Sequence, residues 1–152
     1  MEGEGKRTPL PGEEGRKNLN EFIVFEVSGL NFALSTRWLK EVIPFPVFSL
    51  LPENPLFIKG VCLYQEEIIV PFLDWEKIIR KKVEKEPSYL AVTEKEKEFV
   101  GIPLFTPPRL EEDLEEERKE SPYPFTCPSK DREGREIYLL KLDLLWKDLF
   151  KE

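Results

Sequence analysis

Apolar and polar positions alternate from residue 21 onward, and this period of two predicts a chain built largely of β-strands. The first two strands, 22–27 and 32–34, flank the sequence Ser28-Gly29-Leu30-Asn31, which favours a hairpin turn. Two further hairpins are expected, one around Tyr64-Gln65-Glu66-Glu67 and one between residues 92 and 99. Their strands, together with a last strand near the end of the chain, cover 57–63, 68–73, 89–92, 99–104 and 137–142.

Short helices are expected where the alternation stops. Ser35 can cap a first helix, which must end before Pro44 because proline disfavours helical geometry in the residue that precedes it. The apolar face of this helix would consist of Trp38, Leu39 and Val42. Asp74 and Asp143 each precede an amphipathic stretch, so each is expected to cap a helix, the second being a closing helix over 143–150.

The chain also repeats itself. Residues 68–75 parallel residues 137–144 at an offset of 69, and residues 32–34 parallel 100–102 at an offset of 68. Two unrelated landmarks with nearly the same offset indicate two similar β units of about 60 residues each. Residues 1–20 carry many charges, four glycines and almost no apolar side chains, which predicts a disordered tail before these units.

Composition narrows the classes of partner. The formal net charge of −7 disfavours nucleic acid and an anionic membrane, both of which attract an excess of Lys and Arg. No apolar run approaches the roughly 20 residues that span a bilayer, and we expect no signal peptide. Cys62 and Cys127 form no Cys-x-x-Cys motif, which favours free thiols and a cytoplasmic protein.

The candidate chemistry is sparse. The chain has no histidine, which excludes Ser-His and Cys-His nucleophiles and histidine metal sites, and we expect no catalytic residue, metal or cofactor. Asp74 and Asp143 occupy equivalent positions in the two halves, as the paired acids of an aspartic protease do. Their flanks lack the Asp-Thr-Gly or Asp-Ser-Gly turn, so a capping role explains them better. A charged insert over 111–120 contains the acidic run 111–117, which could bind cations or a basic partner but is expected to be a solvated helix or loop.

The order and spacing of several segments resemble the CheW-like domain family. The segments are 22–34 followed by Trp38-Leu39-Lys40-Glu41-Val42, then the Pro-x-x-Pro loop and Gly-Val of 51–61, then 69–74. The second half matches more loosely, through 99–104 and 138–143. This resemblance implies a mainly β fold of two intertwined SH3-like β barrels with short helices, and no enzymatic activity. It places barrel one at about 21–80 with strand exchange, barrel two at about 87–142, and the closing helix at 143–150.

The resemblance also implies partners. Domains of this family link the cytoplasmic tips of chemoreceptors to the regulatory domain of the histidine kinase CheA. The family segment that lies near the receptor groove corresponds in this sequence to Leu39, Glu41, Val42 and Ile43. The strand that leads to the recognition turn matches Gly60 and Val61, and the turn itself matches Tyr64, Gln65 and Glu66.

One departure from the family concerns this turn. The family usually has Asn-Leu-Arg-Gly where this chain has Cys62-Leu63-Tyr64-Gln65-Glu66-Glu67, which is one residue longer and lacks the arginine. The turn is acidic where a basic one is expected, so the partner should present a basic or neutral group there. Two alternatives stay open: a scaffold of another motility or signalling system, and a carboxylate-dependent hydrolase that uses Asp74 and Asp143.

Overall fold

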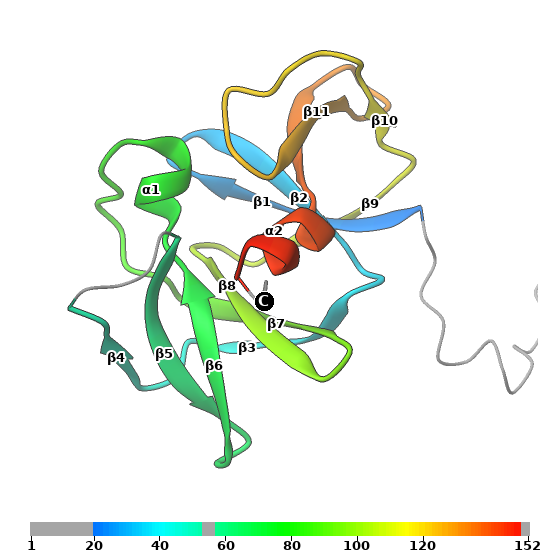
Figure 1. The fold of residues 1–152 in the computed structure, drawn as a ribbon. Coiled ribbons are helices and arrows are strands. Elements are labelled where there is room, and N and C mark those ends of the chain that lie inside the picture. Colours follow the sequence, from blue (N-terminus) through cyan, green and yellow to red (C-terminus); the bar gives the residue numbers. More distant parts are fainter. Residues whose placement is uncertain (1–19, 53–56, 150–152) are drawn as a thin grey trace, which may run out of the picture.

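A computed structural model describes residues 20–52 and 57–149. The predicted tail lies outside these residues except for Asn20, as do residues 53–56 of the proline-rich loop and residue 150 of the predicted closing helix. The described chain is mainly β, with twelve strands and two short helices (Figure 1). This architecture confirms the fold class that the alternating pattern predicts.

Six strands form the first sheet: β1 (Glu21–Val27), β2 (Leu30–Ser35), β9 (Arg109–Glu112), β10 (Glu115–Glu116), β11 (Thr126–Lys130) and β12 (Glu136–Leu140). Their order is β10-β11-β12-β2-β1-β9. The second sheet contains β3 (Leu39–Pro44), β4 (Phe48–Leu50), β5 (Ile58–Tyr64), β6 (Ile68–Leu73), β7 (Tyr89–Lys95) and β8 (Glu98–Leu104). Their order is β3-β7-β8-β6-β5-β4.

The two sheets share one plan. In the first sheet the hairpin β1–β2 lies beside the hairpin β11–β12 through a parallel pairing of β2 with β12. In the second sheet β5–β6 lies beside β7–β8 through a parallel pairing of β6 with β8. Each sheet therefore joins one hairpin from each half of the repeat. The barrel limits of about 21–80 and 87–142 remain a prediction.

Three clusters of buried apolar side chains hold this arrangement together. The cluster of the first sheet contains Phe22, Val24, Ala33, Ile137 and Leu139. The cluster of the second sheet contains Cys62, Tyr64, Val70, Phe72, Leu90 and Val92. The largest cluster lies between the sheets and includes both helices; there the ring of Phe32 lies 4.7 Å from that of Trp75. Figure 1 shows α2 (Leu142–Leu149) between the two sheets.

Two of the expected elements differ from the structure. Residues 39–44 are not a helix but the strand β3, which pairs with β7 from Leu39↔Thr93 to Pro44↔Tyr89. The apolar spacing fits a helix, but pairing with β7 satisfies the backbone and overrides that local preference. The acidic run is not a solvated helix or loop throughout, because β9 pairs with β1 and β10 pairs with β11.

Of the two aspartates that are expected to cap helices, only one does so. Asp74 caps α1 (Trp75–Ile79) as predicted, and its Oδ1 accepts a 3.1 Å hydrogen bond from the backbone N–H of Glu76. Asp143 is not a cap, because α2 begins one residue earlier, at Leu142. It lies in the first helical turn, where a carboxylate still interacts favourably with the helix dipole.

Candidate docking surface

The structure brings together the two segments that the sequence predicts to bind a partner. The hydroxyl of Tyr64, at the end of β5, donates a 2.6 Å hydrogen bond to Oε2 of Glu41 on β3. The side-chain amide of Gln65 donates to the same hydroxyl over 3.3 Å. We call Glu41, Tyr64, Gln65 and Glu66 the turn surface. It forms although β3 is a strand rather than the expected helix.

The turn itself has a fixed backbone geometry. Gln65 and Glu66 both have positive φ angles, 54° and 66°, and the N–H of Glu67 donates to the carbonyl of Tyr64 over 3.3 Å. Two successive left-handed residues between antiparallel strands are the geometry of a type I′ hairpin turn. Neither residue is glycine, so the turn keeps its shape against a local conformational preference and points two acidic side chains, Glu66 and Glu67, into solvent.

The Tyr64 phenol is held in its protonated form. Its ring is buried, 6.0 Å from the ring of Phe99. Burial first, and then the hydrogen bond to the Glu41 carboxylate, raise the pKa of Tyr64 to about 12. The phenol therefore keeps its proton at neutral pH, where it can donate to the Glu41 carboxylate. This bond fixes the position of the acidic turn relative to β3.

The other predicted residues on β3 face inward in part. Leu39 and Val42 pack against the cluster between the sheets, and Ile43 packs against the cluster of the second sheet. A register shift between Leu39 and Glu41 lets the strand turn its side chains toward both clusters. Of the four predicted positions on β3, only Glu41 is exposed, and Leu39, Val42 and Ile43 are half-buried.

Gly60 and Val61 have different roles from each other. Gly60 is buried, and a β-carbon at this position would collide with the backbone carbonyl of Ser49 and the ring of Phe72. Its lack of a side chain allows β4 to approach β5, which is a structural role. Val61 is half-buried on the outer face of β5, opposite Pro71.

That outer face carries apolar residues which sequence reasoning missed. Leu63 and Ile69 are directly opposite each other on β5 and β6, and they are 50% and 68% exposed. We call these two residues, together with Val61 and Pro71, the apolar face. The available signal was the run Ile68-Ile69-Val70-Pro71-Phe72, because a strand that is apolar at consecutive positions is apolar on both faces.

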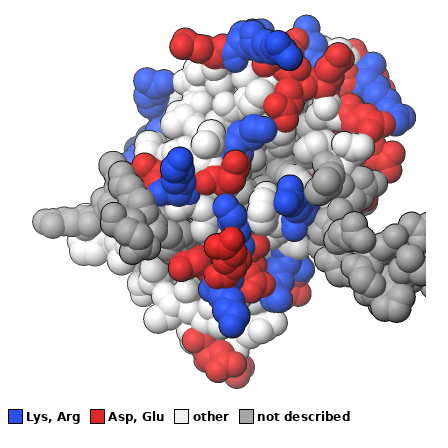
Figure 2. Space-filling model, turned by 45° about the vertical axis from the view of Figure 1, so that its right-hand side comes forward, with Lys and Arg blue, Asp and Glu red and all other residues white. Residues whose placement is uncertain are grey.

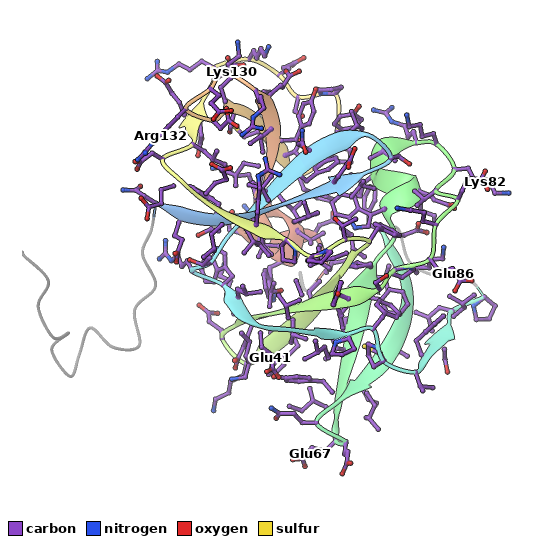
Figure 3. The ribbon with its side chains drawn as sticks, turned by 180° about the vertical axis from the view of Figure 1, so that it is seen from behind. Glu41, Glu67, Lys82, Glu86, Lys130 and Arg132 are labelled. Atoms are coloured by element: carbon purple, nitrogen blue, oxygen red, sulfur yellow. The ribbon has the colours of Figure 1, made fainter. Side chains whose placement is uncertain are left out.

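Exposed apolar side chains are concentrated in this part of the molecule. Seven large apolar residues of the described chain are exposed, and five of them lie on β4, β5, β6 or just before β4: Val47, Phe48, Leu50, Leu63 and Ile69. Glu66 and Glu67 lie at the tip of the same hairpin, and Figure 3 shows Glu67 at that tip. In Figure 2 the lowest part of the molecule is acidic and borders an uncharged surface. Leu63 and Ile69 lie on the outer face, whereas Phe48 and Leu50, opposite Cys62 and Gly60, lie on the other face of the same sheet. Exposed apolar side chains beside a polar margin are typical of a protein-binding surface.

The paired-carboxylate arrangement is not present. Asp74 and Asp143 line different cavities, the first between β4 and α1 and the second beside the β7–β8 hairpin. Oδ1 of Asp74 is engaged by the N-terminus of α1, whereas Asp143 is exposed on α2. Within the described residues no group of three or more Cys, Asp or Glu side chains could hold a metal ion. In the same part of the chain no helix is long and apolar enough to cross a membrane.

Comparison with known proteins rests on the fold. No family model matches the chain, and no curated protein matches it either. Among solved structures, the crystal structure of the scaffolding protein TtCheW from Thermoanaerobacter tengcongensis superimposes with a TM-score of 0.69. The match covers 90% of this chain and 88% of that one. This chain has the CheW fold. The sequences are 17% identical, so the CheW fold is shared across a large divergence in sequence.

Proposed function

We propose that this protein is a non-catalytic, cytoplasmic adaptor of the CheW-like family, which couples chemoreceptor cytoplasmic tips to the regulatory domain of the histidine kinase CheA. The CheW fold and the motifs quoted above support the family. The observation that carries an adaptor role is the apolar face, whose Leu63 and Ile69 are exposed on the β5–β6 hairpin beside the turn surface.

The hydrolase alternative loses support from the same structure. It needs two acids that converge in one cleft, and Asp74 and Asp143 line separate cavities. The capping bond of Asp74 accounts for its burial without chemistry. An adaptor needs neither convergent acids nor a cofactor, only complementary surfaces.

A scaffold of another signalling or motility system is favoured by one observation, the acidic turn. Glu66 and Glu67 are exposed where the family usually presents an arginine. A receptor tip that is acidic at this contact would be repelled, so a partner with a basic or neutral residue is favoured instead. This second candidate keeps the adaptor role and changes the receptor.

Reconstitution tests the proposal. The purified protein is mixed with the CheA regulatory domain and a chemoreceptor tip from the same organism, and complexes are separated by sedimentation. We expect a ternary complex that depends on this protein. Binding to the kinase domain without the receptor tip would favour the second candidate, and binding to neither would contradict the proposal.

A further inference from the structure

A cavity of about 350 Å³ lies at the other end of β6 from the turn surface, between β4, the start of α1 and residues 83–87. Its aromatic lining includes Phe45, Phe48 and Phe72. The three ring centroids are 5.2–5.7 Å apart and the ring planes are inclined by 76–90°, so each pair meets edge to face. No residue of the turn surface lines this cavity, although Phe48 on its wall lies opposite Cys62, two residues before Tyr64.

The cavity is apolar inside and open at its mouth. Trp75 on its wall is buried, and its indole N–H is already satisfied by a 2.8 Å hydrogen bond to the carbonyl of Pro103. Phe48 and Leu50 at the edge remain 45% and 56% exposed. Binding of a complementary apolar group in this cavity would remove these side chains from water, which is thermodynamically favourable.

Acidic side chains outnumber basic side chains around the cavity. Four carboxylates line it, those of Asp74, Glu76, Glu84 and Glu86, against the two lysines Lys59 and Lys85. Asp74 and Glu76 each accept a backbone N–H, from Glu76 and Val83 respectively. Glu84 and Glu86 are exposed and form no ion pair with any residue that the structure describes. Figure 3 shows Glu86 beside β4.

We propose that this cavity binds an aromatic side chain of a protein partner, presented next to a lysine or arginine. The edge-to-face phenylalanines match an aromatic ring, because aromatic pairs prefer such offset or edge-on geometry. The unpaired glutamates match a cation beside that ring. The volume is at the lower end of ligand pockets, which suits one anchoring side chain rather than a metabolite.

This site rests on the proposed function only in requiring a protein partner. It is separate from the turn surface and the apolar face, so the two can be tested independently. A partner that engages both ends of β6 would hold the adaptor at two points. Two linked contacts raise affinity beyond either one alone.

Protein NMR with short synthetic peptides tests the proposal. The probes are Ac-Lys-Trp-Lys-NH₂, Ac-Lys-Ala-Lys-NH₂ and Ac-Glu-Trp-Glu-NH₂, titrated into the labelled full chain. We expect saturable shifts of the Phe48, Phe72 and Val83 signals with the first peptide and none with the alanine peptide. The acidic peptide should bind about two- to fivefold more weakly, as expected of exposed ion pairs.

Two variants and a control make the result specific. Phe48→Ala should abolish the shifts and Glu86→Lys should weaken binding of the first peptide, whereas Leu110→Ala, an exposed residue of the other sheet, should change nothing. Equal shifts with the tryptophan and alanine peptides, or none at the cavity, would overturn the proposal and leave the adaptor role untouched. If the chain self-associates and Phe48→Ala abolishes that association, the cavity would belong to an interface with a second copy. This result would also overturn the proposal.

Discussion

The Tyr64 hydroxyl donates a 2.6 Å hydrogen bond to the Glu41 carboxylate, although three strands separate β3 from β5 in the order of the second sheet. The sheet must therefore curl until its first strand faces the end of the β5–β6 hairpin. The bond joins the two segments of the turn surface directly. It makes the position of an exposed, acidic turn depend on one buried phenol.

Removing this hydroxyl should loosen the turn. We expect Tyr64→Phe to lower the free energy of unfolding by about 1 kcal/mol, the usual net value of one hydrogen bond. Glu41 is exposed and can be rehydrated, so the loss should not be larger. Urea unfolding measures the stability, and amide shifts of Gln65 and Glu66 report the turn. Tyr89→Phe is the control, because within the described chain the Tyr89 hydroxyl forms no hydrogen bond. An equal loss in both variants would contradict the assigned role.

The same bond predicts a dependence on pH. The pKa of Tyr64 is about 12 in the folded protein against an ordinary value of 10.0. A raised pKa of this phenol contributes stability that is complete below pH 10 and is lost as the pH rises toward 12. In that interval Tyr64 ionises in the unfolded chain but not in the folded one. The stability gap between wild type and Tyr64→Phe should therefore narrow from pH 9 to pH 12. A gap that widens over this range would show that the phenol is not held protonated.

The two aspartates should respond differently to substitution. Asp74→Ala should destabilise the protein by about 1 kcal/mol, and Asp74→Asn by much less, because asparagine also caps a helix. Asp143→Asn should change stability by at most a few tenths of that amount, since this residue is exposed in the first turn of α2. Thermal melts test the order. Hydrolase turnover that disappears in Asp74→Asn, with the fold intact, would contradict the adaptor account.

Much of this fold follows from the sequence, because the strands alternate clearly and the hairpin turns have suitable residues. The three expected hairpins and the cap at Asp74 are confirmed. Local signals failed at β3, where the spacing of Trp38, Leu39 and Val42 fits a helix. The strand β7 instead supplies a pairing partner from 45 to 54 residues further along the chain. Local signals also failed at Asp143, because the backbone carbonyl of Lys141 starts the helix before that residue.

The candidate site was predictable in part. The proximity of Glu41 to the turn followed from family resemblance, and the structure confirms that contact. The exposure of Leu63 and Ile69 did not follow from local pattern, because an apolar run in a strand is equally compatible with burial on both faces. Only the tertiary arrangement shows that nothing in the described chain covers them.

Charge reversal at the turn tests the chemistry of the partner. We expect Glu66→Arg to weaken binding of the native partner and to strengthen binding of a receptor tip that is acidic at this contact. Glu26→Arg is a matched control, because Glu26 is exposed on β1 of the other sheet and its substitution changes the net charge by the same amount. Isothermal titration of both variants gives the comparison. Identical affinities for Glu66→Arg and the wild type would remove the turn surface from the interface.

The apolar face provides the most direct test of the adaptor role. The measurement is the affinity with which three forms of this protein bind the CheA regulatory domain. The forms are the wild type, the double variant Leu63→Asp/Ile69→Asp, and Leu110→Asp, which replaces an exposed leucine on β9. All positions are at least half exposed, so the variants should fold, as circular dichroism can verify. The account predicts that the double variant loses at least tenfold in affinity, which corresponds to about 1.4 kcal/mol, and that Leu110→Asp loses none. Unchanged affinity in the double variant would contradict it.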